Sequence, residues 1–159
     1  METNNYMIDF MSQISGLLNG EQKKFWDWKI CCAKPVKCVS IKEVLTPQEI
    51  ERIKALKPMM KECFKNAASI VMFAGIEGVT YVEGEIGIRD TVGVEHAFNR
   101  RGDKYFDVTL ELGAERDVTT EDYISILEVE DNRKVCDAIL ECASWTSLIP
   151  YFYDRKNLI

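Results

Sequence analysis

The residues best suited to chemistry are one histidine and one aspartate in a segment that predicts a β-hairpin. His96 is the only histidine of the chain, and a turn centred on Arg101 and Gly102 places it directly opposite Asp107 on one face of a sheet. A carboxylate that accepts a hydrogen bond from one ring nitrogen fixes the tautomer and orientation of the imidazole and stabilises its charged form. The pair is therefore typical of a general base and its orienting acid, and it lacks only a nucleophile.

Cys63 is the best candidate for the nucleophile because it lies near the start of a helix that the sequence predicts to be buried. Unpaired backbone N–H groups and the positive end of the helix dipole favour a thiolate there. A helix that begins near Glu62 puts the thiol in its first turn, whereas a start at Pro58 puts it in the second turn and weakens this effect. The spacing also fits a plainer interpretation, in which Cys63 fills the core, His96 is a satisfied hairpin histidine and Asp107 caps a turn.

The sequence around these residues resembles that of transglutaminase-like, papain-related cysteine enzymes. EHAFN at 95–99 and GDKYFDVT at 102–109 are similar to the family's His-Ala-aromatic, hairpin, aromatic-x-Asp-x-Thr signature, and CFKNA from Cys63 is similar to its nucleophile helix. The resemblance covers residues 60–112. It implies that Cys63 forms an acyl-enzyme with an amide, that His96 acts as general base and then acid, and that Asp107 orients His96.

The chain also departs from the family's pattern. Members often carry a tryptophan beside the nucleophile, whereas Phe64 follows Cys63 here. The backbone N–H of Cys63 is suited to stabilise an oxyanion, as helix N-termini are, and Asn66 and Gln48 are the side chains considered for a second donor.

Alternating glutamates on a predicted strand suggest how a substrate is bound. Glu83, Glu85 and Glu95 can form an acidic rim that favours a cationic or amine-bearing substrate. A solvated sheet face is the alternative interpretation of the same pattern. The predicted substrate-binding residues are Asn66, Tyr81, Glu83 and Asn99.

Nothing in the sequence indicates a metal or a cofactor. Cys31, Cys32 and Cys38 cluster without the C-x-x-C spacing of a zinc site, and Cys136 and Cys142 fall on different faces of a predicted helix. Phosphate-binding loops, dinucleotide fingerprints and H-E-x-x-H are absent, so we expect neither a cofactor nor a bound metal.

Composition sets the class of protein. The 159 residues suit one domain with its own core, and a net charge of -6 argues against nucleic acid and anionic membranes as partners. No apolar stretch approaches the length of a membrane span, and the first residues lack the basic region of a secretory signal. We therefore expect a cytoplasmic protein with reduced thiols, and the oligomeric state stays open.

The pattern of elements predicts an α+β fold with a papain/transglutaminase-like core. Residues 1–45 form an N-terminal cover, 46–129 hold the core helices and an antiparallel sheet, and 130–159 add a C-terminal helix and tail. The buried nucleophile-bearing helix packs on the sheet. Helices are predicted at 6–18, 46–57, 59–74 and 131–143, strands at 80–88, 94–99, 104–112 and 123–129, short strands within 25–30 and 36–41, and a docking aromatic segment at 148–153.

The favoured function is a cysteine-dependent acyl-transfer enzyme that acts on an amide in a protein, a peptide or a small molecule. It includes peptidase, amidase, deamidase and transglutaminase-type reactions through Cys63, His96 and Asp107. The alternative is a non-catalytic binding module that recognises a protein or a metabolite beside His96. A purely structural role would be favoured if Cys63 were buried and His96 did not touch Asp107.

Overall fold

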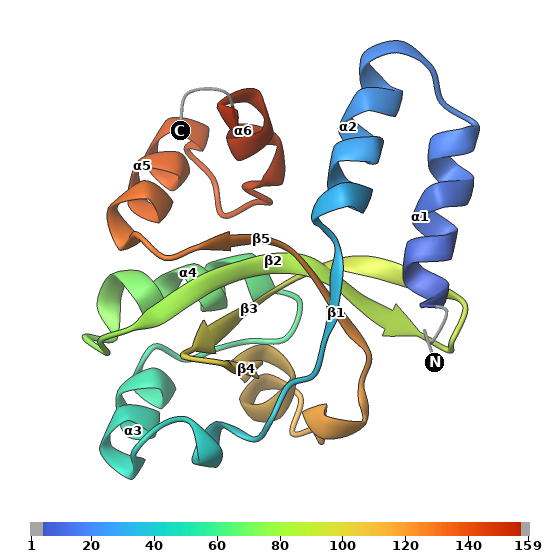
Figure 1. Cartoon of the computed structure of the whole chain (residues 1–159). Helices are drawn as coiled ribbons and strands as arrows, with labels where there is room; N and C mark the ends of the chain where they lie inside the picture. Colours follow the sequence, from blue (N-terminus) through green and yellow to red (C-terminus); the bar gives the residue numbers. More distant parts are fainter. Residues whose placement is uncertain (1–4, 157–159) are drawn as a thin grey trace.

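The computed structural model describes residues 5–156 and has an α+β fold built on one curled, antiparallel sheet (Figure 1). The five strands lie in the order β1-β5-β2-β3-β4. Their bounds are β1 (Lys34–Val36), β2 (Val79–Ile88), β3 (Val92–Arg101), β4 (Lys104–Phe106) and β5 (Tyr123–Val129). The predicted α+β class is therefore confirmed.

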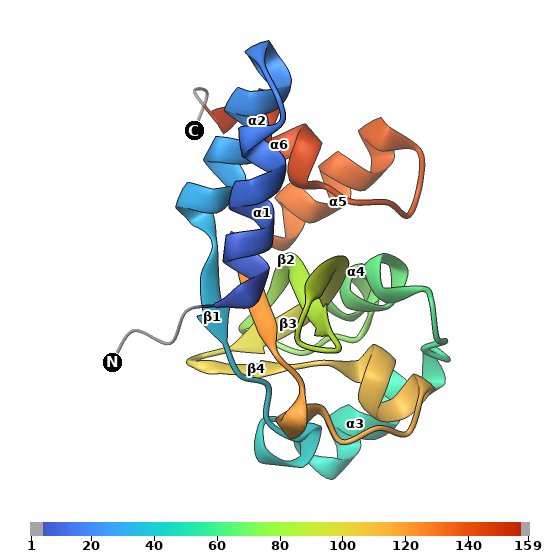
Figure 2. The ribbon, with the colours of Figure 1, turned by 90° about the vertical axis from the view of Figure 1, so that its right-hand side faces the viewer.

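Helices pack against this sheet. Their bounds are α1 (Tyr6–Gly16), α2 (Gly20–Cys32), α3 (Pro47–Ala55), α4 (Cys63–Phe73), α5 (Asn132–Cys142) and α6 (Ile149–Asp154). The helices α1 and α2 lie side by side as an upright pair, with α5 and α6 beside them (Figures 1 and 2). Within residues 5–156, no helix combines the length and the apolar character that crossing a membrane requires.

The central strands confirm most of the predicted meander. β2 and β3 pair along their whole length from Val79 and Arg101 to Ile88 and Val92, and β5 occupies the other edge of β2. The predicted strand at 104–112 is wrong beyond Phe106, because the chain turns into a single π-helical turn over Thr109–Gly113. The cause is a side chain that competes with the ladder, since the carboxylate of Asp107 accepts the backbone N–H groups of Thr109 and Leu110.

The N-terminal cover differs from the prediction in one element. A strand within 25–30 is wrong, because these residues belong to α2. Phe25 and Trp28 are three positions apart, so a helix presents both on one side, and both rings pack edge-on against Tyr153 of α6. The short strand predicted within 36–41 lies earlier in the chain, as β1 over Lys34–Val36.

The helix that carries Cys63 packs against the middle of the sheet, as predicted. Ala67 and Ala68 of α4 are buried, and their small side chains allow the helix to approach the strands closely. The side-chain amide of Asn99 on β3 donates to the carbonyl of Ala67 at 3.1 Å. This helix begins at Cys63 and not at Met59, since residues before it form an irregular turn. The predicted helix at 46–57 is present as α3, which starts at a capping box formed by Thr46 and Glu49.

We expect Gly84→Ala to lower the free energy of unfolding by about 3 kcal/mol, at the upper end of typical overpacking costs. A Cβ atom at Gly84 would lie 1.8 Å from the backbone oxygen of Ile124, so β5 would have to move away from β2. Gly16→Ala is the control, because a Cβ atom there meets no atom of the described residues within 4 Å. Urea denaturation of the two variants measures the difference, and equal stability would contradict the tight β2–β5 contact.

Candidate active site

The centre of the site is a buried pair of His96 and Asp107. The Nε2 atom of His96 lies 2.7 Å from Oδ2 of Asp107, and the two residues are 6% and 0% exposed. The same Oδ2 accepts the hydroxyl of Tyr123 at 2.8 Å, while Oδ1 accepts the backbone N–H of Thr109 at 3.0 Å. Both carboxylate oxygens of Asp107 are therefore hydrogen-bonded. Since Nε2 of His96 is engaged by Asp107, its Nδ1 atom is available to a different group.

The hairpin register differs from the predicted one. Asn99 pairs with Phe106 and Arg101 with Lys104, so the turn is centred on Gly102 and Asp103 and not on Arg101 and Gly102. Gly102 has a φ of 62°, a left-handed conformation that favours glycine inside the turn and explains the shift.

His96 and Asp107 still meet in the shifted register. Moving the turn centre by one residue changes the pairing by two positions, which keeps both side chains on one face. Extension of the register past Phe106 sets Asp107 beside Phe98 and diagonal to His96. The predicted direct opposition is therefore wrong, and the predicted contact is made across the diagonal.

The environment of His96 favours its charged form. Burial alone would lower the pKa of the imidazole, but the negative charge of Asp107 and its hydrogen bond outweigh burial and raise the pKa to about 10. The side chain of Cys63 lies close enough to add to this rise. The imidazole is therefore protonated at neutral pH, with the thiol of Cys63 near it.

Cys63 is the first residue of α4 and is partly exposed. Of the two predicted starts, the one near Glu62 is confirmed, so the thiol is in the first turn. Among residues 5–156 no side chain caps this helix, and the N–H groups of a first turn have no partner within the helix. Among the described residues the thiol and the ring of His96 form no well-aligned hydrogen bond, which is common for a nucleophile and its base before substrate binds.

Asn66 and Gln48 do not lie where an oxyanion donor is needed. The side-chain amide of Asn66 donates to the carbonyl of Met59 at 2.8 Å and to the hydroxyl of Thr109 at 2.9 Å. It thereby ties the turn before Cys63 to the turn after Asp107. Gln48 is exposed in the first turn of α3. The backbone N–H of Cys63 remains the donor that the helix start supplies.

The other predicted substrate-binding residues are buried on the α4 side of the sheet. Asn99 donates to the backbone of Ala67 and Thr80, and Tyr81 donates to Glu83 at 2.6 Å. Glu83 also accepts the hydroxyl of Ser147, and burial raises its pKa to about 7. Their role in substrate binding stays a prediction. Glu83 and Glu85 are both buried, so the alternative of a solvated sheet face is wrong for them.

Sequence reasoning missed Tyr123, which holds Asp107 from β5. No local signal marks this tyrosine, because the contact depends on how β5 and the turn after β4 come together. Among residues 5–156, no three His, Cys, Asp or Glu side chains are grouped to hold a metal ion. Comparisons with protein-family models, curated proteins and solved structures find no match for this chain.

Proposed function

We propose that the protein is a cysteine-dependent acyl-transfer enzyme that acts on an amide through Cys63, His96 and Asp107. The observation that carries the proposal is the buried His96–Asp107 pair, 2.7 Å apart, next to a partly exposed thiol at an uncapped helix start. A binding or structural protein has no need to bury an imidazole and a carboxylate beside such a thiol. A buried ion pair adds little stability compared with apolar residues of similar volume.

The proposal begins from an ion pair of thiolate and imidazolium. A histidine whose pKa is about 10 already holds its proton at neutral pH and cannot take one from a neutral thiol. In the proposed mechanism Cys63 reacts as a thiolate beside the imidazolium, and the free N–H groups of α4 stabilise the sulfur anion. Asp107 keeps the ring oriented and balances its charge.

The reaction then proceeds in two acyl transfers. The thiolate attacks the carbonyl carbon, and the electron pair of the C=O bond moves to the oxygen, which accepts the backbone N–H of Cys63. The C–N bond breaks as His96 gives its proton to the departing nitrogen, and a thioester forms on Cys63. Water or a second amine attacks the thioester while it gives a proton to His96, and the thiolate leaves.

The acyl-enzyme is the intermediate to trap. We expect p-nitrophenyl acetate to release one p-nitrophenolate per wild-type chain in a fast first phase and to leave one acetyl group on Cys63. Peptide mass spectrometry locates that group. Cys63→Ser should lose the fast phase, and His96→Gln should slow it about a hundredfold.

The exposed cysteines Cys31 and Cys142 are internal controls in the same digest. They report the reaction of ordinary thiols with the ester under identical conditions. Acetylation of Cys63 no faster than of these two residues would contradict the proposed function.

A further inference from the structure

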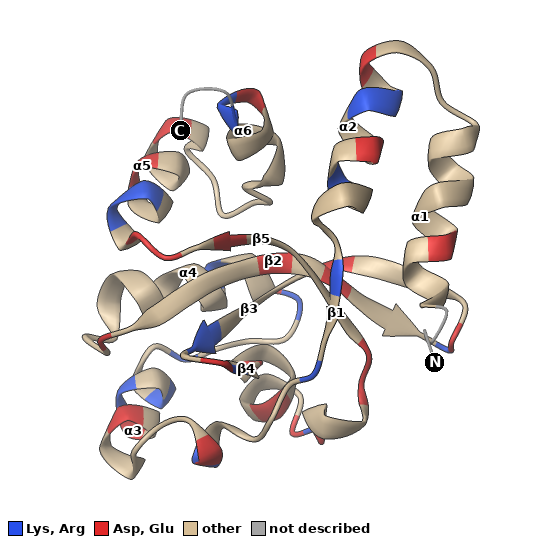
Figure 3. Ribbon diagram, in the orientation of Figure 1, with Lys and Arg blue, Asp and Glu red and all other residues tan. Residues whose placement is uncertain are grey.

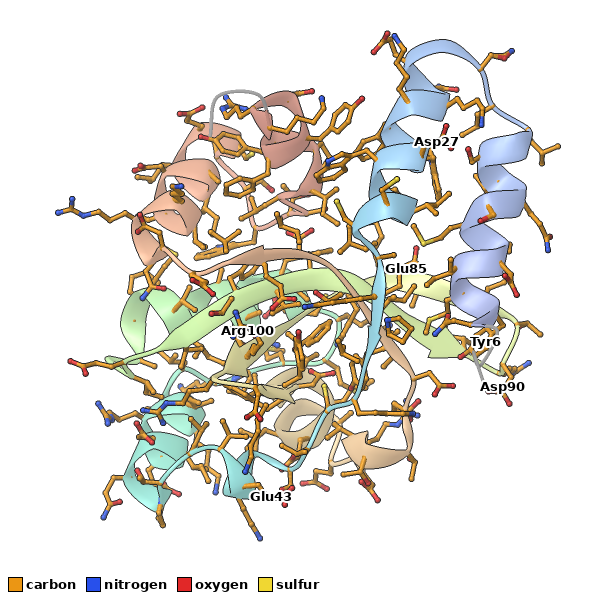
Figure 4. All side chains as sticks on the ribbon, in the orientation of Figure 1. Tyr6, Asp27, Glu43, Glu85, Asp90 and Arg100 are labelled. Atoms are coloured by element: carbon orange, nitrogen blue, oxygen red, sulfur yellow. The ribbon has the colours of Figure 1, made fainter. Side chains whose placement is uncertain are left out.

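A second polar feature is a cavity of about 230 Å³ between α2, the strands β2 and β3, and the loop that leads into α6. Its size suits a molecule smaller than a typical drug. Figure 3 shows basic residues on α2 and acidic residues on β2 below it, and Figure 4 labels Glu85 where the N-terminal helices meet the sheet. The lining includes Phe25, Lys29, Glu85, Glu95, Ser147 and Ile149.

Glu85 is buried without the partner that a carboxylate requires. It is 6% exposed, and its Oε2 atom has no hydrogen-bond partner among the described residues. Gly93 on β3 leaves room for this group, because a Cβ atom there would lie 2.2 Å from Oε2. A carboxylate turns readily about its last bond, so either oxygen can face the cavity. An unpaired buried carboxylate is destabilising. A ligand that donates a hydrogen bond to Glu85 from within the cavity removes this cost.

Lys29 presents the opposite charge in the same cavity. It is 5% exposed, and its ammonium lies 3.5 Å from the centre of the Trp26 ring. Burial lowers the pKa of Lys29, while the charges of Glu85 and Glu95 raise it. Within residues 5–156, Lys29 nevertheless forms no ion pair within 4.0 Å. The cavity is therefore lined by a buried ammonium, that of Lys29, and a buried carboxylate, that of Glu85, which do not form an ion pair with each other.

We propose that this cavity binds a small molecule that carries both an ammonium group and an oxygen acceptor, such as an α-amino amide with an apolar side chain. The ammonium pairs with Glu85, the oxygen accepts from Lys29, and the apolar side chain contacts Phe25 and Ile149. Lys29 repels a bare metal cation, and Glu85 and Glu95 repel a simple anion. With two carboxylates and one ammonium, the lining favours a ligand of net positive charge over a zwitterion.

The test is a titration followed by two-dimensional NMR, with L-leucinamide as the probe. It is done at about pH 6.5, below the pKa of about 7.7–8.0 of an α-amino group, so that the probe is cationic. Two matched compounds each lack one group: 3-methylbutylamine has no carbonyl, and 4-methylpentanamide has no ammonium. We expect saturable shifts at Glu85 and Ser147 with L-leucinamide and at least tenfold weaker binding of the other two.

Variants separate binding from folding. Glu85→Gln should weaken L-leucinamide binding at least tenfold while thermal stability stays equal or rises, because the variant removes a buried unpaired charge. A merely structural role of Glu85 would lower stability instead. Lys29→Met keeps most of the buried chain and should also weaken binding, whereas Lys24→Met, on the exposed side of α2, should not.

The inference does not depend on the proposed function. Cys63→Ser should bind L-leucinamide as the wild type does, so loss of the enzyme activity leaves this result unchanged. Absence of saturable L-leucinamide binding at millimolar concentration would overturn the inference, as would binding that Glu85→Gln leaves unaltered. Equal affinity for 3-methylbutylamine would overturn the role of Lys29.

Discussion

Replacing Asp107 with alanine is expected to lower the free energy of unfolding by about 3–5 kcal/mol, a large part of the stability of a typical domain. The carboxylate is fully buried and accepts hydrogen bonds from four donors: His96, Tyr123 and the backbone of Thr109 and Leu110. Its removal leaves these four buried donors without their acceptor, and it also removes the charge that stabilises the imidazolium of His96 against burial. Urea denaturation at neutral pH measures the loss.

Asp103 provides the matched control because it lies in the same hairpin and is exposed. Asp103→Ala should change the free energy of unfolding by no more than about 0.5 kcal/mol. A loss below about 1 kcal/mol in Asp107→Ala would mean that the carboxylate does not hold the charged imidazole, and the account of the site would then be wrong.

The second large effect is a dependence of stability on pH that belongs to His96. Burial opposes its charge, but Asp107 prevails and raises the pKa of the imidazole from its ordinary value of 6.5 to about 10 in the folded chain. Between these values the folded state holds a proton that the unfolded state has lost, so stability falls as pH rises. The contribution is fully present below about pH 6.5 and is lost through pH 10, with a slope of at most about 1.4 kcal/mol per pH unit.

His96→Gln removes the contribution of His96 to the pH dependence of the free energy of unfolding. The contributions of the other titrating groups are nearly the same in both proteins and largely cancel when the two are compared. The difference in free energy of unfolding between wild type and His96→Gln should therefore shrink steadily from about pH 7 to pH 10. Chemical denaturation at a series of pH values measures it. A difference that is constant, or that grows with pH, would show that Asp107 does not stabilise the imidazolium.

The contact of His96 with Asp107 could be predicted from sequence because it depends mainly on which face of the hairpin each residue occupies. The predicted turn centre was wrong by one residue, yet a change of two positions in pairing keeps the same face. Gly102 is the residue that indicates the correct turn, since its left-handed backbone suits the turn's first central position. The sequence left two possible starts for α4, because among the described residues no side chain caps its first turn and marks where it begins.

Other features depend on contacts between distant segments and had no local signal. Tyr123 reaches Asp107 from β5, and the rings of Phe25 and Trp28 favour a helix only because Tyr153 packs against both. The burial of Glu85 is likewise set by α2 above the sheet and not by the alternating pattern of its strand. That pattern indicates a strand with one polar face, and the cover over this face comes from elsewhere in the chain.

The rate of iodoacetamide labelling at Cys63 at about pH 6 tests the central claim most directly, in wild type and in His96→Gln. An ordinary thiol, with a pKa of about 8.5, is almost entirely protonated there and reacts slowly, as the exposed Cys31 and Cys142 should in the same sample. We predict that Cys63 is labelled far faster than these two residues in wild type and about a hundredfold more slowly in His96→Gln. Labelling of Cys63 that is no faster than that of Cys31 and Cys142, or that His96→Gln leaves unchanged, would contradict a Cys63–His96 pair.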